Sequence, residues 1–442
     1  MEKVYETYKK TNHYWYPTIP KKWKVCKVKH IAKTYAGGTP STVKAEYWNR
    51  GNIPWLPSGK LQNGDITKAE KFITEKGLNG SSTKWIKENT VLVALTGATC
   101  ANIGYLKFKA CANQSVVAID EFKDKANSRF LYFMFLMMRK QILTHQTGGA
   151  QAGINDGNVK NLYLLLPSLK EQTQIAAYLD YHTQLIDTLI SKKETLIQKL
   201  KEQRQAIINE AVTKGLNPDV KLKDSGIEWL SDIPEHWEVA KLKWLSNIYS
   251  GGTPSTNIES YWTNGTIPWL NSGTVNQKRI TKASEYITDV ALQNSSTKWV
   301  NKGSILMALA GQGKTKGMAA MLEFDATCNQ SMAAIEVDDS KAYNEFILIW
   351  LESNYLNIRS MGGGEKLDGI NLQILGNIYC PLPTLDEQKE IFKHVSNLTS
   401  KIEISSEELI KSIQKLKEYR QSLISEAVTG KIDVRNWQAP KS

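Results

Sequence analysis

The stretch that comes closest to a known chemical motif is 308–315, Ala-Leu-Ala-Gly-Gln-Gly-Lys-Thr, which fits a relaxed phosphate-binding loop. Such a loop binds phosphates when its glycine-rich turn opens a helix and a nearby acidic residue holds Mg²⁺. The residues that follow, 316–321, are a poor start for a long helix. We therefore expect no nucleotide site at this stretch.

Residues that could hold a metal or form a nucleophilic centre are scattered along the chain. The five Cys form no CxxC pair, and the six His show no metal-ligand spacing. The sequence contains neither an Asn/Asp-Pro-Pro-Tyr/Phe methyltransferase motif nor a glycine-rich loop for S-adenosylmethionine. We expect no catalytic residue, metal or cofactor in this chain, and the odd number of Cys favours a reduced, cytoplasmic setting.

The charge of the chain indicates a class of partner. Its formal net charge is +12, spread along 442 residues, and such a surplus favours polyanions through counterion release. No run of about 18 apolar residues occurs, so no membrane partner is expected. The length predicts at least two domains.

An internal duplication organises the sequence. Gly-Gly-Thr-Pro-Ser-Thr at 37–42 recurs at 251–256, a shift of 214, and a later two-residue insertion moves the shift to 216. Further copies, in the same order, are 53–56 and 267–270, 81–85 and 295–299, 113–115 and 329–331, and 171–172 and 387–388. The chain is therefore a repeated unit of roughly 215 residues.

Each repeat has a globular part and a helical part. Short β-branched runs predict strands, and helices are expected at 128–143 and 343–358. We expect an α+β fold: two tandem α/β domains, each followed by a long helix, with the two helices forming an antiparallel coiled coil. The expected boundaries are 1–166 for the first domain, 167–214 for the central helical region, 215–382 for the second domain, 383–430 for the C-terminal helical region and 431–442 for a tail.

The long helices have recognisable ends and an apolar seam. Segments 167–171 and 383–387 predict capping boxes, in which a hydroxyl accepts the glutamate N–H and the glutamate reaches back to the cap; Gly215 and Gly430 predict left-handed C-caps. A narrow apolar stripe favours pairing of the two helices over separate packing on each globule. The predicted seam, with His182 as a polar register residue, is Ile175, Leu179, Ile186, Leu189, Leu196, Leu200 and Ile207, and in the second helix Ile391, Val395, Leu398, Ile402, Leu409, Leu416, Tyr419 and Leu423.

This layout resembles the specificity subunits of type I restriction-modification systems. The resemblance covers nearly the whole chain and rests on 37–42 with Tyr47-Trp48, Ile53-Pro54-Trp55, their second copies, and the Leu-Pro-x-Leu-x-Glu-Gln entry to each helix. It implies two target-recognition domains, each reading half of a bipartite site in double-stranded DNA, with helices that set the gap. It also implies docking of two methyltransferase subunits and of restriction-translocase subunits, whose S-adenosylmethionine, ATP and Mg²⁺ would belong to the partners.

Comparison of the two copies separates framework from candidate DNA contacts. Three loops differ between the copies and carry amide, hydroxyl and cationic groups, which read base edges or bind phosphates; the alternative is a merely tolerant surface. The candidates are Ser58, Lys60, Gln62, Thr96, Thr99 and Gln151 in the first copy, and Ser272, Thr274, Gln277, Lys278, Gln312, Lys314, Thr315 and Lys366 in the second.

Residues identical in both copies favour a structural role. Trp15, Trp23, Trp48, Trp55 and Trp85 each recur at +214, which indicates core packing rather than base stacking. Asn-Gln at 113–114 and 329–330 indicates buried amides that brace the loops more than direct contacts. Two other classes stay open: a self-sufficient DNA-modifying enzyme, which the missing motifs disfavour, and a coiled-coil scaffold without sequence preference.

Overall fold

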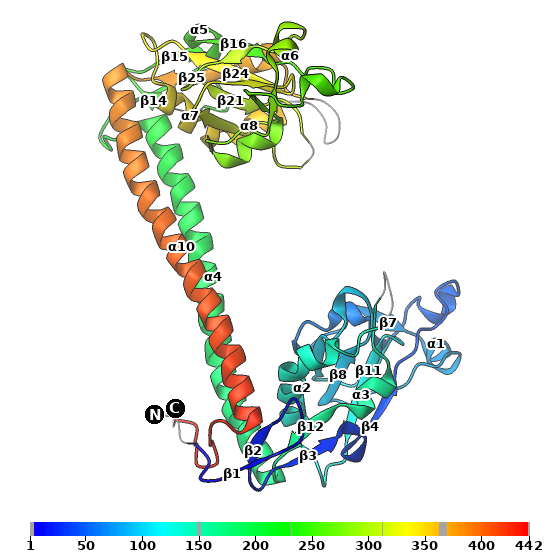
Figure 1. Ribbon diagram of the computed structural model, residues 1–442. Coiled ribbons are helices and arrows are strands. Elements are labelled where there is room, and N and C mark those ends of the chain that lie inside the picture. Colours follow the sequence, from blue (N-terminus) through cyan, green and yellow to red (C-terminus); the bar gives the residue numbers. More distant parts are fainter. Residues whose placement is uncertain (1–3, 148–151, 231, 312, 362–368, 441–442) are drawn as a thin grey trace. The chain divides into compact units, whose positions relative to one another are not determined.

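The computed structural model describes residues 4–147, 152–230, 232–311, 313–361 and 369–440. These residues form two compact units. Unit 1 combines the chain up to residue 193 with the segment from 410 onward, and unit 2 comprises residues 194–409. Each long helix therefore gives one half to each unit (Figure 1). Three candidate DNA contacts, Gln151, Gln312 and Lys366, lie outside the described residues.

Unit 1 contains a five-stranded sheet of order β4-β11-β8-β9-β6 and a three-stranded sheet of order β10-β5-β7. Two strand pairs, β1-β2 and β3-β12, complete it. The strands are β1 (Tyr8–Lys10), β2 (Thr18–Pro20), β3 (Lys24–Lys27), β4 (Ala32–Ala36), β5 (Ile53–Leu56), β6 (Gly64–Ile66), β7 (Lys71–Ile73), β8 (Thr90–Ala94), β9 (Ile103–Leu106), β10 (Cys111–Ala112), β11 (Val116–Glu121) and β12 (Tyr163–Leu166), and the helices are α1 (Glu75–Asn79), α2 (Ser128–Leu143), α3 (Asp156–Asn161) and the first half of α4 (Leu169–Lys214).

Unit 2 repeats this plan. Its five-stranded sheet has the order β16-β24-β21-β22-β18, and a four-stranded sheet has the order β19-β17-β23-β20. The strands are β13 (Leu222–Asp224), β14 (Asp232–Pro234), β15 (Glu238–Lys241), β16 (Ser246–Ser250), β17 (Ile267–Leu270), β18 (Arg279–Ile280), β19 (Glu285–Ile287), β20 (Trp299–Val300), β21 (Ile305–Ala308), β22 (Ala319–Leu322), β23 (Ala326–Cys328), β24 (Met332–Val337) and β25 (Tyr379–Leu382). The helices are α5 (Leu242–Leu245), α6 (Asp289–Gln293), α7 (Asn344–Ser353), α8 (Tyr355–Ser360) and α9 (Leu372–Gly376), with the second half of α4 and the first half of α10 (Leu385–Thr429).

The central sheet of each unit is buried on both faces. In unit 2, Ile305 and Met307 of β21 pack into one core with Phe346 of α7, whereas Leu306 and Ala308 on the opposite face pack with the smaller sheet. Successive residues of a strand point to opposite faces, so a continuous apolar run is what such a strand requires. The apolar runs of β8 and β21 are fully buried for this reason.

The predicted domain helices are confirmed with one difference. The first runs from Ser128 to Leu143, as the sequence predicts. In the second copy the helix is interrupted: α7 ends at Ser353 and α8 begins at Tyr355. Asn354 separates them, and its buried amide donates to the Trp350 carbonyl at 3.1 Å. An Asn that bonds locally to the backbone competes with continuation of the helix.

The ends of the long helices are capped largely as expected. Ser168 and Thr384 accept the backbone N–H of Glu171 and Glu387, and Gly215, at φ +75°, has the left-handed conformation of a C-cap. The glutamates do not complete the capping boxes. Glu171 accepts the indole N–H of Trp23 at 3.0 Å and Glu387 accepts that of Trp237 at 2.9 Å, because a buried indole N–H requires a partner.

The glutamine that follows each of these glutamates joins the long helix to the domain. Gln172 is fully buried, donates to the Pro167 carbonyl at 3.0 Å and accepts the N–H of Asn127, the N-cap of α2, at 2.8 Å. Gln388 makes the matching bonds to Pro383 and Tyr343. The repeated Glu-Gln pair therefore fixes each long helix to its own globule.

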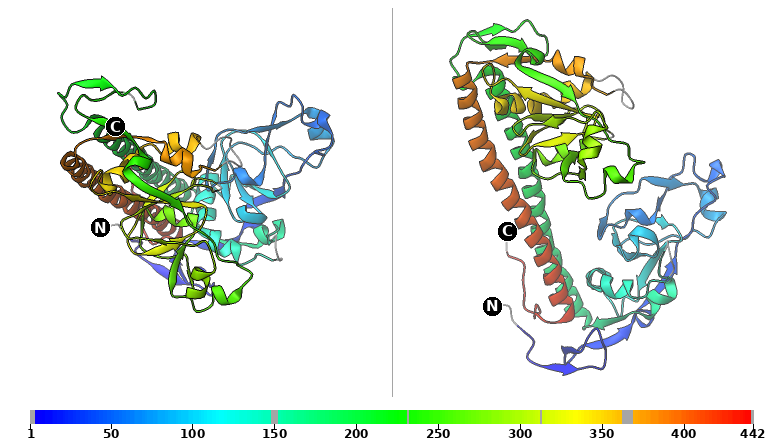
Figure 2. Two further views of the ribbon diagram at one scale, coloured as in Figure 1. Left: turned by 90° about the horizontal axis from the view of Figure 1, so that it is seen from above. Right: turned by 45° about the horizontal axis from the view of Figure 1, so that its top comes forward.

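The long helices pair in antiparallel fashion (Figures 1 and 2). In unit 1, Asp187 of α4 forms a bidentate pair with Arg420 of α10, at 2.8 and 3.1 Å. In unit 2, Arg204 of α4 lies 3.4 Å from Glu403 of α10. The residue numbers rise along one helix as they fall along the other. This confirms the predicted antiparallel coiled coil.

Most seam residues are buried or half-buried as predicted, with three exceptions. Leu189, Leu196 and Tyr419 are 43, 45 and 53% exposed, so their assignment to the seam was wrong. Ile190 and Ile413 take buried places instead. The ring of His182 packs on Tyr178 and on Trp437 of the C-terminal tail. Within the described residues, no helix is both long and apolar enough to span a membrane.

Candidate nucleic-acid interface

The strand ends of unit 1 bring several loops to one edge of the domain. Gly37, after β4, donates to the Val116 carbonyl at 3.0 Å, and Leu95, after β8, donates to the Ser115 carbonyl at 2.8 Å. Asn113, after β10, donates to the Leu56 carbonyl at the end of β5. The loops that follow β4, β5, β8 and β10 therefore lie together, and we call this the loop edge of unit 1.

The stretch that precedes α3 reaches the same edge. Gly153 forms an isolated bridge with Thr96 and another with Thr147, so Thr147 and Gly153 lie beside the loop after β8. Two of the variable loops of the first copy, and the described residues on either side of 148–151, thus approach one another. Sequence spacing alone places them far apart, and the sheet order brings them together.

Unit 2 has the same arrangement. Gly252 donates to the Cys328 carbonyl at 2.8 Å, Leu309 to the Ser331 carbonyl at 2.8 Å, and Asn329 to the Leu270 carbonyl at 2.9 Å. Ile370 donates to the Leu309 carbonyl, which anchors the segment before α9. We call this the loop edge of unit 2.

The Gly-Gly segment at each loop edge is held by close packing. A Cβ on Gly37 would lie 2.1 Å from the Ala112 carbonyl oxygen, and one on Gly251 would lie 1.9 Å from that of Cys328. Real Cβ atoms do not approach backbone so closely, so only glycine fits at these two positions. The first glycine of each pair is fixed by this approach rather than by a positive φ.

Tryptophans secure the second glycine of each pair. In unit 1 the Gly38 carbonyl accepts the indole N–H of Trp55 at 2.9 Å and the hydroxyl of Thr83 at 2.8 Å. In unit 2 the Gly252 carbonyl accepts the same two bonds from Trp269 and Thr297, both at 3.0 Å. These matched bonds form a clamp that fixes the backbone of the loop edge.

The expectation that the repeated tryptophans are core residues holds for some of them. Trp23 and Trp237 are fully buried, and Trp55 and Trp269 are 5 and 7% exposed. It was wrong for two others, because Trp15 and Trp299 are 39 and 45% exposed. A two-ring side chain can pack one face and leave the other in water, which residue type alone does not reveal.

The candidate contacts of unit 1 fall into two groups: side chains that are accessible at the loop edge, and side chains that bond to other residues of the domain. Gln62 and Thr96 are exposed and Ser58 is half-buried, so all three offer polar groups at the loop edge. Lys60 forms an ion pair with Glu70. The hydroxyl of Thr99 donates back to the carbonyl at position 96.

Three candidates of unit 2 have roles inside the domain. Thr274 is buried and donates to the Asn271 carbonyl at 2.7 Å, which removes it as a base contact. The Gln277 amide bonds backbone groups at 281 and 282. Lys278 lies 3.3 Å from Glu403 on α10.

The other described candidates of unit 2 lie on its loop edge. Lys314 is exposed, while Ser272 and Thr315 are half-buried. The described residues between β21 and β22 form no helix, and the segment leads into strand β22. The phosphate-loop pattern therefore lacks the helix that its chemistry requires.

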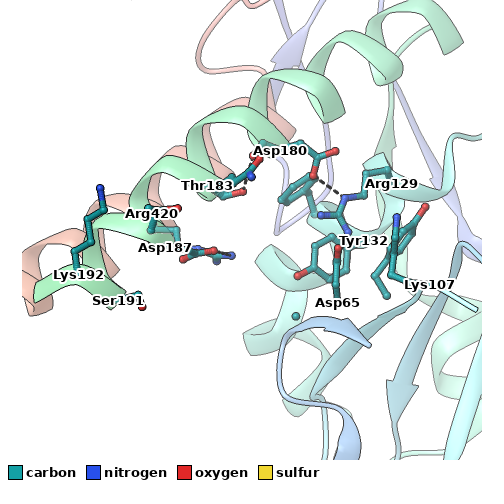
Figure 3. A pocket seen from close by; sticks show the side chains of 15 residues that line it. Asp65, Lys107, Arg129, Tyr132, Asp180, Thr183, Asp187, Ser191, Lys192 and Arg420 are labelled. Carbon is teal, nitrogen blue, oxygen red and sulfur yellow. Dashed lines mark hydrogen bonds and ion pairs between the residues drawn. The ribbon is translucent and has the colours of Figure 1, made fainter. Parts of the chain in front are cut away.

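A charged cluster away from the loop edges was not expected from the sequence (Figure 3). In unit 1, Arg129 of α2 contacts Asp65 of β6 and Asp180 of α4, the latter at 2.7 Å. Its guanidinium also stacks 4.6 Å from the ring centroids of Tyr105 and Tyr132. This cluster joins the sheet, α2 and α4 at an open cleft.

The equivalent cluster of unit 2 has opposite charges at three of its positions. Arg279 of β18 contacts Glu323 and, at 2.6 Å, Glu345 of α7. By the repeat shift these positions match Asp65, Lys107 and Arg129. The cation and the anions have exchanged places, and no pattern in a single copy signals this. Superposition of the two copies by their shift would have found it.

The buried thiols offer no nucleophile near these sites. Burial raises the pKa of Cys111 and of Cys328 to about 12, so both remain protonated thiols at neutral pH. Cys111 begins β10 and Cys328 ends β23, the strands that contact the Gly-Gly segments. They act as small apolar residues.

Comparison with known proteins agrees with this architecture. A family model described as the type I restriction modification DNA specificity domain matches residues 20–201 and again 234–415. The type I restriction enzyme MjaIX specificity subunit of Methanocaldococcus jannaschii is 28% identical, over 94% of this chain and 95% of its own. The EcoBI specificity subunit of Escherichia coli is 25% identical, over 80% of this chain and 76% of its own.

Two solved structures share the fold. A chain from a study of assembly and conformational transition in a type I restriction-modification system gives a TM-score of 0.74 at 16% identity, covering 94% of this chain and 99% of that one. The HsdS subunit from Thermoanaerobacter tengcongensis gives 0.55 at 16% identity, covering 94% and 98%. With two matches of the family model and curated relatives along its whole length, this chain belongs to the family of type I restriction-modification specificity subunits, the non-catalytic subunits that determine DNA sequence specificity.

Proposed function

We propose that the chain selects a bipartite site in double-stranded DNA, with the loop edge of each unit reading one half-site. The observation that carries this proposal is the pair of loop edges: the same strand ends, glycines and tryptophan clamps support loops that differ in sequence. A shared frame with different polar loops suits two domains that recognise different bases.

The proposed base contacts come from the exposed candidates. Gln62 and Thr96 in unit 1 and Lys314 in unit 2 retain free access to a partner. Amides suit the edge of adenine and lysine suits guanine. We also propose Gln151, Gln312 and Lys366 as base contacts, because the sequence places them in the variable loops.

The proposed partners follow from the family. Two methyltransferase subunits and the restriction-translocase subunits would dock on the chain, and S-adenosylmethionine, ATP and Mg²⁺ would be bound by those subunits. The outward Leu189 and Leu196 of α4 are apolar groups that a docking subunit could cover. This chain would select the DNA site, and its partner subunits would catalyse the reactions there.

Mapping methylated adenines in the host genome tests the proposal. A bipartite motif with two different halves and a fixed gap is expected, and it should disappear when the gene for this chain is deleted. Footprinting of the complex with its methyltransferase subunits should protect the same site. Protection of no defined sequence would support the scaffold alternative, and methyl transfer by the isolated chain would support the enzyme alternative.

A further inference from the structure

We infer that Gln114 and Gln330 bind the DNA phosphate backbone, one at each half-site, and so hold any duplex against the loop edge without reading its sequence. This inference rests on the proposed DNA-binding function. Both side chains are exposed, at the loop edge of unit 1 and of unit 2 respectively. Their identity in the two copies contrasts with the variable loops beside them.

That identity indicates what the two glutamines contact. Two domains that read different half-sites share only the features common to every duplex, and these are its phosphates and sugars. A glutamine that read a base would require the same base pair at the same place in both halves. Gln114 and Gln330 are exposed polar groups that both loop edges have in common, with Thr39 and Thr253 beside them.

Each glutamine is oriented by a threonine. The hydroxyl of Thr39 donates to Oε1 of Gln114, and that of Thr253 donates to Oε1 of Gln330. The amide oxygen is thereby used, and the NH₂ group retains two N–H donors. Within the described residues no other hydrogen-bond partner of Gln114 or Gln330 is present. Donors without acceptors suit a phosphate oxygen.

The orienting threonines are themselves held in place. Thr39 follows Gly38, whose carbonyl accepts bonds from Trp55 and Thr83, and Thr253 follows Gly252, whose clamp is the same. A donor fixed before binding loses little side-chain entropy on binding, so its hydrogen bond contributes more to affinity. The clamp thus has a function beyond packing. It presents one amide per unit at a fixed place.

The expected role of these amides changes accordingly. The sequence favoured buried bracing groups at 113–114 and 329–330. Asn329 is half-buried and accepts the backbone N–H of Ser331, whereas the buried Oδ1 of Asn113 has no hydrogen-bond partner among the described residues. The glutamine that follows is exposed in both copies. Bracing by Thr39 orients this glutamine and leaves its donors facing solvent.

Gln114→Glu and Gln330→Glu test the inference in the complex reconstituted with its methyltransferase subunits. A glutamate still accepts the threonine hydroxyl, so the local structure is kept, but its carboxylate repels phosphate. We expect each variant to weaken binding about fivefold to tenfold. The loss should be equal for the cognate duplex, taken from the methylation map, and for an unrelated duplex of the same length. The double variant should multiply the losses, with the methylated positions unchanged.

Two further variants control for charge and for folding. Gln293→Glu adds the same charge at the exposed end of α6, at a residue that is not a proposed DNA contact; it should change affinity by less than about twofold. Thr39→Val adds no charge and releases the amide, so a smaller loss on both duplexes is expected.

Three results would overturn the inference. Unchanged affinity of both glutamate variants would leave bracing as the role of the amides. A loss confined to the cognate duplex, with relaxed preference at one base pair, would identify a base contact. A loss equal to that of Gln293→Glu would reduce the effect to net charge. If the wild-type complex does not distinguish the cognate from the unrelated duplex, the proposed function itself fails, which is a separate result.

Discussion

The two units follow the same plan, yet they differ in two distinct ways. At the loop edges the variable side chains have changed without compensating changes in the frame. In the charged clusters the changes occur as a set: Asp65, Lys107, Arg129 and Asp180 of unit 1 correspond to Arg279, Glu323, Glu345 and Ser396 of unit 2, so that opposite charges face each other in both. Compensated change indicates residues constrained by one another, whereas uncompensated change indicates residues that respond to something outside the chain.

The charged pairs of the coiled coil follow a third pattern, in which the charges are the same in both copies. Asp187 pairs with Arg420 and Arg204 with Glu403, and by the repeat shift the two acids match each other, as do the two arginines. Each pair joins α4 to α10, and therefore one copy to the other. Inverting the charges of one copy alone would create like-charged pairs. Charges inside a domain can invert independently, but those between the repeats cannot.

Among the substitutions that test this comparison, Arg129→Glu should reduce the stability of its unit the most. The new carboxylate would face Asp65 and Asp180 in a site where Arg129 is only 21% exposed. We expect a loss of about 3 kcal/mol in the stability of unit 1. Hydrogen exchange of the β6 and α2 amides would measure it, since a two-unit chain need not unfold in one step.

Introducing the full set of unit 2 residues into the unit 1 cluster should restore the stability that Arg129→Glu alone removes. Ser396 occupies the position that corresponds to Asp180, so the full exchange is Asp65→Arg, Lys107→Glu, Arg129→Glu and Asp180→Ser. This variant should recover at least half of the lost stability. If it is no more stable than Arg129→Glu alone, the clusters are not interchangeable sets.

Gly37→Ala should have the next largest effect. Its Cβ would enter the space of the Ala112 carbonyl, and forced backbone shifts of this kind cost about 2 kcal/mol. Gly251→Ala should cost the same in unit 2. Gly59, which has open space around its Cβ position, provides the control, and Gly59→Ala should be neutral in thermal unfolding. A tolerated Gly37→Ala would contradict the clamped loop edge.

Trp55→Phe should show the smallest effect. It removes one of two bonds to the Gly38 carbonyl while keeping most of the ring, so we expect a loss of about 1 kcal/mol. Trp269→Phe should match it in unit 2. Adding Thr83→Val leaves the carbonyl without its second donor and should increase the loss more than additively. Strict additivity in thermal unfolding would argue against a shared clamp.

The sequence predicted the repeat, the long helices and α2 because each has strong local signals. The residues of the apolar seam were harder to predict. Apolar residues stand at both 189 and 190, and a stripe with three- and four-residue steps fits either one. The partner helix decides, and it buries Ile190 while leaving Leu189 outward.

The site was predictable only as a set of loops. Their convergence depends on sheet order, which the spacing of segments does not specify. Thr274 was misassigned because the polar stretch 272–277 folds into a 3-10 helix, in which Thr274 is buried and its hydroxyl donates to the Asn271 carbonyl. The charged clusters and the oriented glutamines required contacts between positions far apart in the chain.

Replacing residues 15–166 by the chain's own 229–382 tests the central claim most directly. Asp180→Ser is included so that the incoming Glu345 does not face a second carboxylate. If each loop edge reads one half-site, mapping of methylated adenines should show the half-site of unit 2 unchanged and the other half replaced by a second copy of it. A motif altered in both halves, or unchanged in both, would contradict the account.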